Sequence, residues 1–306
     1  MKIGCTAWTI AGGYDLPFDE AVDTIGRMGF HGIELIAGSR EQIYDYYTDD
    51  QCDKLVSQID EYGMVTSQFV LHKTLIDGLA SLNRHDQEKA LQVFEKGCHI
   101  AKRLNANIIN TVSHSVPGLR APIPYLPSYV YVTVPGVEWF EPKMKMTMPD
   151  FDWDNIWNNY ILSVRRCCDI AAGYGLSFSL EGHPHVIVSH TDSFLRFYGE
   201  VQRDNFGMNF DTAMQADQRE HIPISIRKLK HRIIHMHVRD SDSLVTHRLP
   251  VGKGVLDWQA ILSELKRANY RGFMSIELGK YADPVKWVRE SQTYLQSLLK
   301  EIEKAS

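Results

Sequence analysis

Short runs of apolar and β-branched residues recur along the chain, and segments with helical spacing separate them. Several runs carry little polar alternation, which is typical of strands buried on both faces. They predict strands at residues 3–8, 32–36, 65–71, 107–112, 176–180, 206–210, 233–238 and 273–278. The 3.6-residue periodicity between them predicts helices at residues 18–28, 49–62, 87–104, 153–174, 191–201, 222–231, 257–269 and 284–303.

Strict alternation of strand and helix predicts parallel strands with helices outside them. Eight such units predict an α/β fold, the (β/α)₈ TIM barrel, as a single domain over residues 1–306. A doubly wound open sheet is the alternative, but no glycine-rich nucleotide-binding motif follows the first strand. Residues 115–152 form a proline- and aromatic-rich insertion after the fourth strand. Such a loop is a substrate lid, a subunit contact or a self-packed cover over a helix end.

Composition and charge exclude several classes of protein. The net charge is −5, from 33 basic and 38 acidic side chains, and no basic cluster indicates nucleic-acid binding. No apolar run reaches the roughly 18 residues that a membrane span needs. Five cysteines without a CxxC motif favour a reducing compartment. Because the first residues lack the apolar core of a signal peptide, the sequence predicts a cytoplasmic protein.

Four successive predicted strands, the fifth to the eighth, each end in a carboxylate or an imidazole. In a (β/α)₈ barrel these ends meet at the face that carries the active site. Each residue alone has an ordinary structural reading, a loop or cap residue or a core histidine. Three converging carboxylates repel one another, and a divalent cation removes the conflict. Three oxygens and one imidazole favour Mn²⁺, with Mg²⁺, Co²⁺, Fe²⁺ or Zn²⁺ as alternatives. The predicted ligands are Glu181, Asp211, His237 and Glu277.

Motifs at residues 180–183, 209–212, 235–240, 250–258 and 272–277 resemble the xylose isomerase-like TIM barrel superfamily of sugar isomerases and epimerases. The resemblance spans nearly the whole chain. It implies that the four residues just named bind the metal, and that Glu181 and Glu277 also flank the substrate as an acid/base pair. Such a pair removes a proton beside a metal-polarised carbonyl.

Further polar and aromatic residues lie near the predicted strand ends. His183, two residues beyond Glu181, is a candidate second base, with an outer-shell histidine as the alternative. For the remaining candidates, the alternative to a binding role is an exposed surface charge or packing in the core. The candidate substrate-binding residues are Trp8, His72, His114, Arg239, Asp240 and Lys253.

Three functions remain open. The first is a metal-dependent sugar isomerase or epimerase acting on a small carbohydrate. The second is a keto-sugar lyase, resembling either the catalytic subunit of C-glycoside deglycosidases, which cleave 3-keto glycosides by β-elimination, or an inosose-type dehydratase. The third is a non-catalytic sugar-binding barrel. A homo-oligomer is expected, or a hetero-oligomer with a small subunit if the lyase interpretation holds.

One position departs from the resemblance. Met214 stands where the epimerases and endonuclease IV tend to place a histidine. This departure weakens a direct transfer of ketose 3-epimerase activity. Together with the acidic net charge, it also argues against DNA repair.

Overall fold

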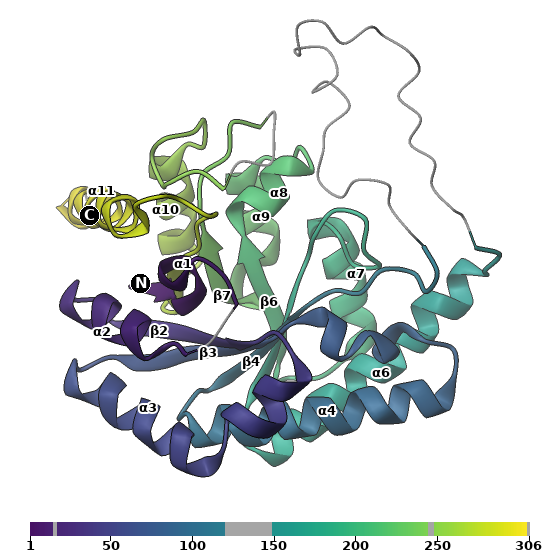
Figure 1. Cartoon of the computed structure of the whole chain (residues 1–306). Coiled ribbons are helices and arrows are strands. Elements are labelled where there is room, and N and C mark those ends of the chain that lie inside the picture. The colour runs from purple at the N-terminus through teal and green to yellow at the C-terminus, as the bar shows by residue number, and fades with distance from the viewer. Residues whose placement is uncertain (15–16, 120–148, 244–247, 305–306) are drawn as a thin grey trace, which may run out of the picture.

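The strands close into a barrel. In the computed structural model, which describes residues 1–14, 17–119, 149–243 and 248–304, the strand order is β1 to β8, with β8 returning to β1 (Figure 1). Every neighbouring pair is parallel. The strands are β1 Lys2–Thr6, β2 Gly32–Ala37, β3 Val65–Leu71, β4 Ile108–Val112, β5 Ser177–Glu181, β6 Phe206–Asp211, β7 Ile233–Val238 and β8 Phe273–Ile276. The eight predicted strands and the (β/α)₈ architecture are confirmed.

All eight predicted helices are present, with ends that differ by a few residues. Their N-termini follow local chemistry: the Thr48, Asn83, Asp152 and Asp257 side chains each accept a hydrogen bond from a backbone N–H of the first turn. The helices are α2 Asp19–Arg27, α3 Asp49–Glu61, α4 Arg84–Arg103, α6 Trp153–Gly173, α7 Thr191–Val201, α9 Ile222–Leu229, α10 Trp258–Arg267 and α11 Pro284–Lys304. No helix among the described residues is long and apolar enough to cross a membrane.

Among the described residues, two short α-helices were not predicted, α1 Ala7–Ala11 and α8 Thr212–Asp217, which directly follow β1 and β6. The expectation that Trp8 ends the first strand is therefore wrong, because the chain turns into α1 after Thr6. Helices of five or six residues are too short to show a periodic pattern. The predicted insertion at 115–152 lies largely outside the described residues.

The apolar faces of the helices pack on the outside of the barrel. In α4, for example, Ala90, Phe94 and Cys98 are buried, and the Phe94 ring lies 5.1 Å from that of Phe178 on β5. All five cysteines are buried and unpaired. The barrel interior near the carboxyl ends of the strands is instead polar, and the site is built there.

Candidate metal centre

Four side chains meet at the carboxyl end of the barrel. Glu181 ends β5, Asp211 ends β6, His237 lies near the end of β7, and Glu277 directly follows β8. One ligand atom from each lies within 4.8 Å of all the others. All four side chains are buried. The structure therefore brings together the four residues that the sequence predicted as metal ligands.

An imidazole and a guanidinium lie among these carboxylates. His237 Nδ1 lies 3.2 Å from Glu181 Oε2 and 3.2 Å from Glu277 Oε2. Arg239 is almost fully buried and pairs with both oxygens of Asp211. Its Nη1 lies 3.0 Å from Glu277 Oε2. These two side chains partly neutralise the buried negative charge.

The pKa values reflect burial and crowding. Burial opposes ionisation of Glu181, but His237 and His183 outweigh it and hold the pKa of that carboxyl well below its usual range. Burial raises the pKa of Asp211, and the Glu181 and Glu277 carboxylates add to the rise although Arg239 opposes it. Burial lowers the pKa of the His237 imidazole, yet the surrounding carboxylates raise it well above its usual value. The three carboxyl groups thus share the positive charge of His237 and Arg239, and His183 adds to it at Glu181.

Sequence reasoning missed a fourth buried carboxylate, that of Glu34 on β2. Its Oε2 lies 3.0 Å from His237 Nε2, and its Oε1 lies 3.4 Å from His235 Nε2. These three side chains form a second buried cluster that shares His237 with the first. A signal was present, because Glu34 is the one charged residue in the otherwise apolar run 32–37. A charge is almost never fully buried unless it is paired.

A chain of polar side chains crosses the barrel interior below this carboxylate. Gln68 Nε2 donates to Glu34 Oε2 over 3.1 Å, and Ser179 Oγ donates to Gln68 Oε1 over 2.8 Å. Asn110 Nδ2 donates to Ser179 Oγ over 3.0 Å. These contacts fix the Glu34 carboxylate, which in turn holds the ring of His237. The far side of that ring, Nδ1, faces Glu181 and Glu277.

The residues fit a divalent cation on three grounds. Three carboxylates and one imidazole are the donor set of hard and borderline divalent metals. Glu277 Oε2 accepts no hydrogen bond from the described residues, although His237 and Arg239 lie within ion-pair distance. Finally, a carboxylate on the far nitrogen is the arrangement that usually orients a metal-binding histidine, and Glu34 supplies it.

Two other predicted residues contact the cluster directly. His183 Nε2 lies 2.7 Å from Glu181 Oε1. The indole Nε1 of Trp8 donates to Glu277 Oε1 over 3.1 Å, and the Trp8 ring meets that of His237 edge-on. Thus α1, although unpredicted, places Trp8 against the acid/base candidate Glu277.

Two predicted substrate contacts, Asp240 and Lys253, have other partners. The Asp240 carboxylate is fully buried and accepts hydrogen bonds from Trp258 Nε1 and from the backbone N–H groups of Ser241, Gly252 and Leu256. It therefore holds the glycine-rich loop before α10. Lys253 pairs with Glu290 on α11 over 3.0 Å.

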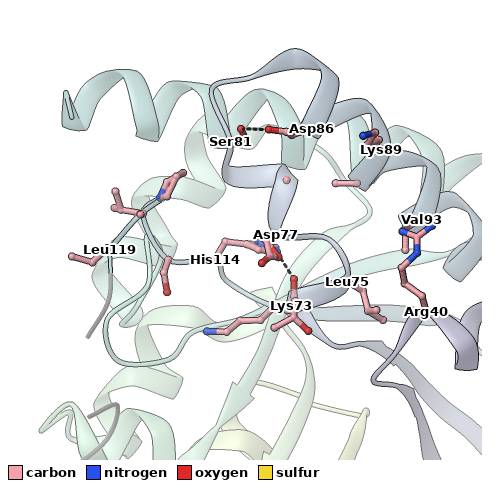
Figure 2. A pocket seen from close by; sticks show the side chains of 17 residues that line it. Arg40, Lys73, Leu75, Asp77, Ser81, Asp86, Lys89, Val93, His114 and Leu119 are labelled. Atoms are coloured by element: carbon pink, nitrogen blue, oxygen red, sulfur yellow. Dashed lines mark hydrogen bonds between the residues drawn. The ribbon is translucent and has the colours of Figure 1, made fainter. Parts of the chain in front are cut away.

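The two remaining histidines follow β3 and β4. His114 is buried, and its Nδ1 lies 2.9 Å from the Tyr160 hydroxyl while its Nε2 lies 3.2 Å from the Lys73 carbonyl. His72 Nδ1 bonds to Thr74 Oγ1, and its ring lies 5.5 Å from that of Tyr14. His114 lines a cavity of about 580 Å³ that Figure 2 shows. His72 does not line it, but its partner Thr74 does.

Comparisons with solved structures agree with the barrel. D-psicose 3-epimerase from Clostridium cellulolyticum superposes with a TM-score of 0.77 at 15% identity, covering 98% of this chain and 99% of that one. The 3-keto-D-glucoside 4-epimerase from E. coli superposes with a TM-score of 0.70 at 18% identity, covering 97% and 99%. At these identities the likeness establishes the fold.

Two sequence relatives match as well. An inosose dehydratase from Mesomycoplasma hyopneumoniae is 20% identical over 310 residues, which covers 94% of this chain and 90% of that protein. An uncharacterized protein from Methanocaldococcus jannaschii is 26% identical over 154 residues, and this match spans about half of each chain, 46% and 53%. The family model described as xylose isomerase-like TIM barrel matches residues 22–298, and the chain belongs to that family.

Proposed function

We propose that this protein is a divalent-metal-dependent sugar isomerase or epimerase that moves a proton at a carbon next to a carbonyl. The observation that carries the proposal is the convergence of Glu181, Asp211, His237 and Glu277 at the barrel mouth, with ligand atoms within 4.8 Å of one another. A cluster that buries three carboxylates is costly for the fold alone, because buried charges need compensation. The presence of such a cluster fits a catalytic role.

The four converging residues would hold the metal, for which Mn²⁺ is the first expectation. When bound, the metal acidifies the C–H next to a carbonyl that it polarises. Glu34 holds His237 Nε2 and so leaves Nδ1 directed at the other ligands. Arg239 holds both oxygens of Asp211 and fixes that carboxylate.

Glu181 and Glu277 act as the acid/base pair in this proposal. Glu181 ends β5, and Glu277 directly follows β8. Because these two strands are not neighbours in the closed barrel, the two carboxylates approach a sugar from different sides. Trp8 holds Oε1 of Glu277. His183 Nε2, 2.7 Å from Glu181 Oε1, can pass a proton to or from that oxygen.

Proton exchange tests the proposal. Protein loaded with Mn²⁺ is incubated in D₂O with free ketoses, the metal is removed, and the sugars are analysed by NMR. Deuterium at the carbon beside the carbonyl, together with an epimer or an aldose, is the expected result. Binding of the sugars without any exchange would leave a sugar-binding barrel and contradict the proposal.

A keto-sugar lyase is the second candidate, and two observations favour it. His183 touches the Glu181 carboxylate and supplies a base beside the predicted ligand set. The inosose dehydratase, which matches along 94% of this chain, is by its name a lyase. In a lyase the proton removed next to the keto group is followed by departure of a β-substituent. Release of the aglycone from a 3-keto-glucoside, with no exchange into free ketoses, would establish this candidate instead.

A further inference from the structure

Asn209 on β6 lies between a predicted metal ligand and a histidine that the proposed function does not use. Glu181 on β5 is the register partner of Asn209, and His235 on β7 is its register partner on the other side. The register between β6 and β7 shifts just before Asn209, an irregularity that commonly re-aims side chains near active sites. The three residues therefore form one row across three strands, and all three side chains are buried.

The hydrogen bonds of Asn209 fix the orientation of its amide. Its Nδ2 donates to Glu181 Oε2 over 2.8 Å, and its Oδ1 accepts from His235 Nδ1 over 3.2 Å. A carboxylate oxygen and an amide oxygen only accept hydrogen bonds, so the amide nitrogen must face Glu181 and His235 Nδ1 must carry a proton. The reverse orientation of the amide would bring two acceptors together at Glu181 and two donors together at His235. In a buried row such unmet contacts are costly, so His235 holds the amide in place.

The two oxygens of Glu181 have different surroundings. Oε2, which accepts from Asn209, lies 3.2 Å from Nδ1 of His237, another predicted ligand. The Asn209 amide nitrogen lies 3.2 Å from the same Nδ1. Oε1 instead lies 2.7 Å from His183 Nε2, and His183 is not one of the four clustered residues. One carboxylate thus faces a predicted metal ligand with one oxygen and a candidate base with the other.

We infer that Asn209 is a positioning residue, held by His235, which directs Glu181 Oε2 to the metal and leaves Oε1 for proton transfer with His183. The inference rests on the proposed function for the metal and the proton, and it adds the residues that separate the two tasks of Glu181. The last side-chain torsion of a glutamate is broad, so without the Asn209 donor the two oxygens could exchange places. The metal would then have to order the carboxylate itself, at a cost in binding free energy.

Variants on the two sides of Glu181 separate these tasks. Asn209→Leu keeps a branched side chain of similar shape but removes the amide donor to Oε2. His183→Leu removes the imidazole beside Oε1. Electron paramagnetic resonance of free Mn²⁺ gives the metal affinity, and deuterium exchange into ketoses at saturating Mn²⁺ gives the rate of proton transfer. Asn155→Leu, an exposed change on α6, is the matched control and should alter neither quantity.

The two variants should show opposite losses. We expect Asn209→Leu to weaken Mn²⁺ binding by about 10–100-fold, and to keep exchange at saturating Mn²⁺ within about threefold because the bound metal then orders Oε2 itself. We expect His183→Leu to lower exchange by about 10²-fold and to leave Mn²⁺ affinity within about threefold. Unchanged Mn²⁺ affinity in Asn209→Leu would overturn the inference. An equal loss of affinity in both variants, or a large loss of exchange in Asn209→Leu at saturating Mn²⁺, would also overturn it.

Substitutions of His235 test its part in the row, and they keep the inference testable if Asn209→Leu does not fold. An asparagine amide places a donor close to the position of a histidine Nδ1, so His235→Asn retains the hydrogen bond to Asn209 that His235→Leu removes. Mn²⁺ affinity should fall about tenfold in His235→Leu and return to within about threefold of the wild-type value in His235→Asn. If His235 only fills space, affinity will instead follow the free energy of unfolding of the metal-free variants, which urea measures. That result would remove His235 from the inference.

Failure of this inference and failure of the proposed function give different results. If the wild-type protein binds Mn²⁺ but exchanges no sugar proton, the proposed chemistry fails, and the Mn²⁺ affinities of the Asn209 and His235 variants still decide the positioning role. If the wild-type protein exchanges protons and Asn209→Leu binds Mn²⁺ normally, the proposed function stands and the inference fails. An inactive wild-type protein that binds no Mn²⁺ would reject both.

Discussion

The two halves of the barrel mouth differ in their side chains: one half gathers buried charged groups, and the other encloses a cavity. After β5 to β8 the mouth is filled by buried carboxylates, an imidazole and a guanidinium that contact one another. After β2 to β4 it is hollow and lined by both polar and apolar side chains. Charged groups must converge to move a proton, whereas recognition of a ring needs space. One half of the mouth therefore crowds charge, and the other leaves space.

Removing one acid from the crowded half is the strongest test of this division. We expect Glu277→Gln to reduce proton exchange by about 10³-fold, because the amide cannot act as a base. The fold should remain, since Gln still accepts the Trp8 hydrogen bond at that position. Exchange rates and circular dichroism measure the two effects, and Glu301→Gln, an exposed change on α11, is the matched control. Full activity of Glu277→Gln would remove the acid/base pair from the mechanism.

Asp240 marks the edge of the crowded half, because it follows β7 closely and yet faces the glycine-rich loop. Asp240→Ala removes an acceptor from four donors, and we expect the free energy of unfolding to fall by about 2–4 kcal/mol. Urea denaturation measures this loss. Asp283→Ala, which removes one exposed acceptor at the start of α11, should cost about 1 kcal/mol or less. Unchanged stability with lost substrate binding would instead support the predicted substrate contact of Asp240.

Glu34 comes from β2 but belongs with the crowded half. We expect Glu34→Gln to weaken Mn²⁺ binding about 10–100-fold, because the carboxylate that orients His237 is lost. Electron paramagnetic resonance of free Mn²⁺ gives both the affinity and the number of ions per chain, and Glu41→Gln, an exposed change, is the control. One ion per wild-type chain is expected. Two ions, one of them lost in the variant, would make Glu34 a ligand.

The smallest expected effect is on how the free energy of unfolding of the metal-free protein changes with pH. Burial, with Asp211 adding to it, raises the pKa of Asp217 to about 6. Because this folded-state pKa lies above the unfolded value, the free energy of unfolding should fall as pH rises from about 4 through 6. Asp217→Asn should flatten that decline by about 1 kcal/mol, a figure reduced for partial solvent exposure. Urea unfolding from pH 4 to 7.5 measures it, and an unchanged decline would contradict the assignment.

Periodicity located the barrel and the ends of its strands, and strand ends in a parallel barrel share one face. That is why Glu181, Asp211, His237 and Glu277 could be grouped from the sequence alone. Side-chain direction could not be predicted in the same way. Asp240 lies three residues beyond His237 and turns to a loop that closes only in three dimensions. Glu34 sits inside a strand whose apolar neighbours suggested only a core position.

Arg239 has a consequence for how the protein is assembled. Its guanidinium lies within ion-pair distance of two of the clustered carboxylates and acts as a built-in substitute for external positive charge. A domain held together by its metal alone cannot fold without it. Because the Arg239 guanidinium already supplies positive charge to the cluster, we expect the chain to fold before it binds a metal. The identity of the bound metal then depends on which divalent ions are available to the folded barrel.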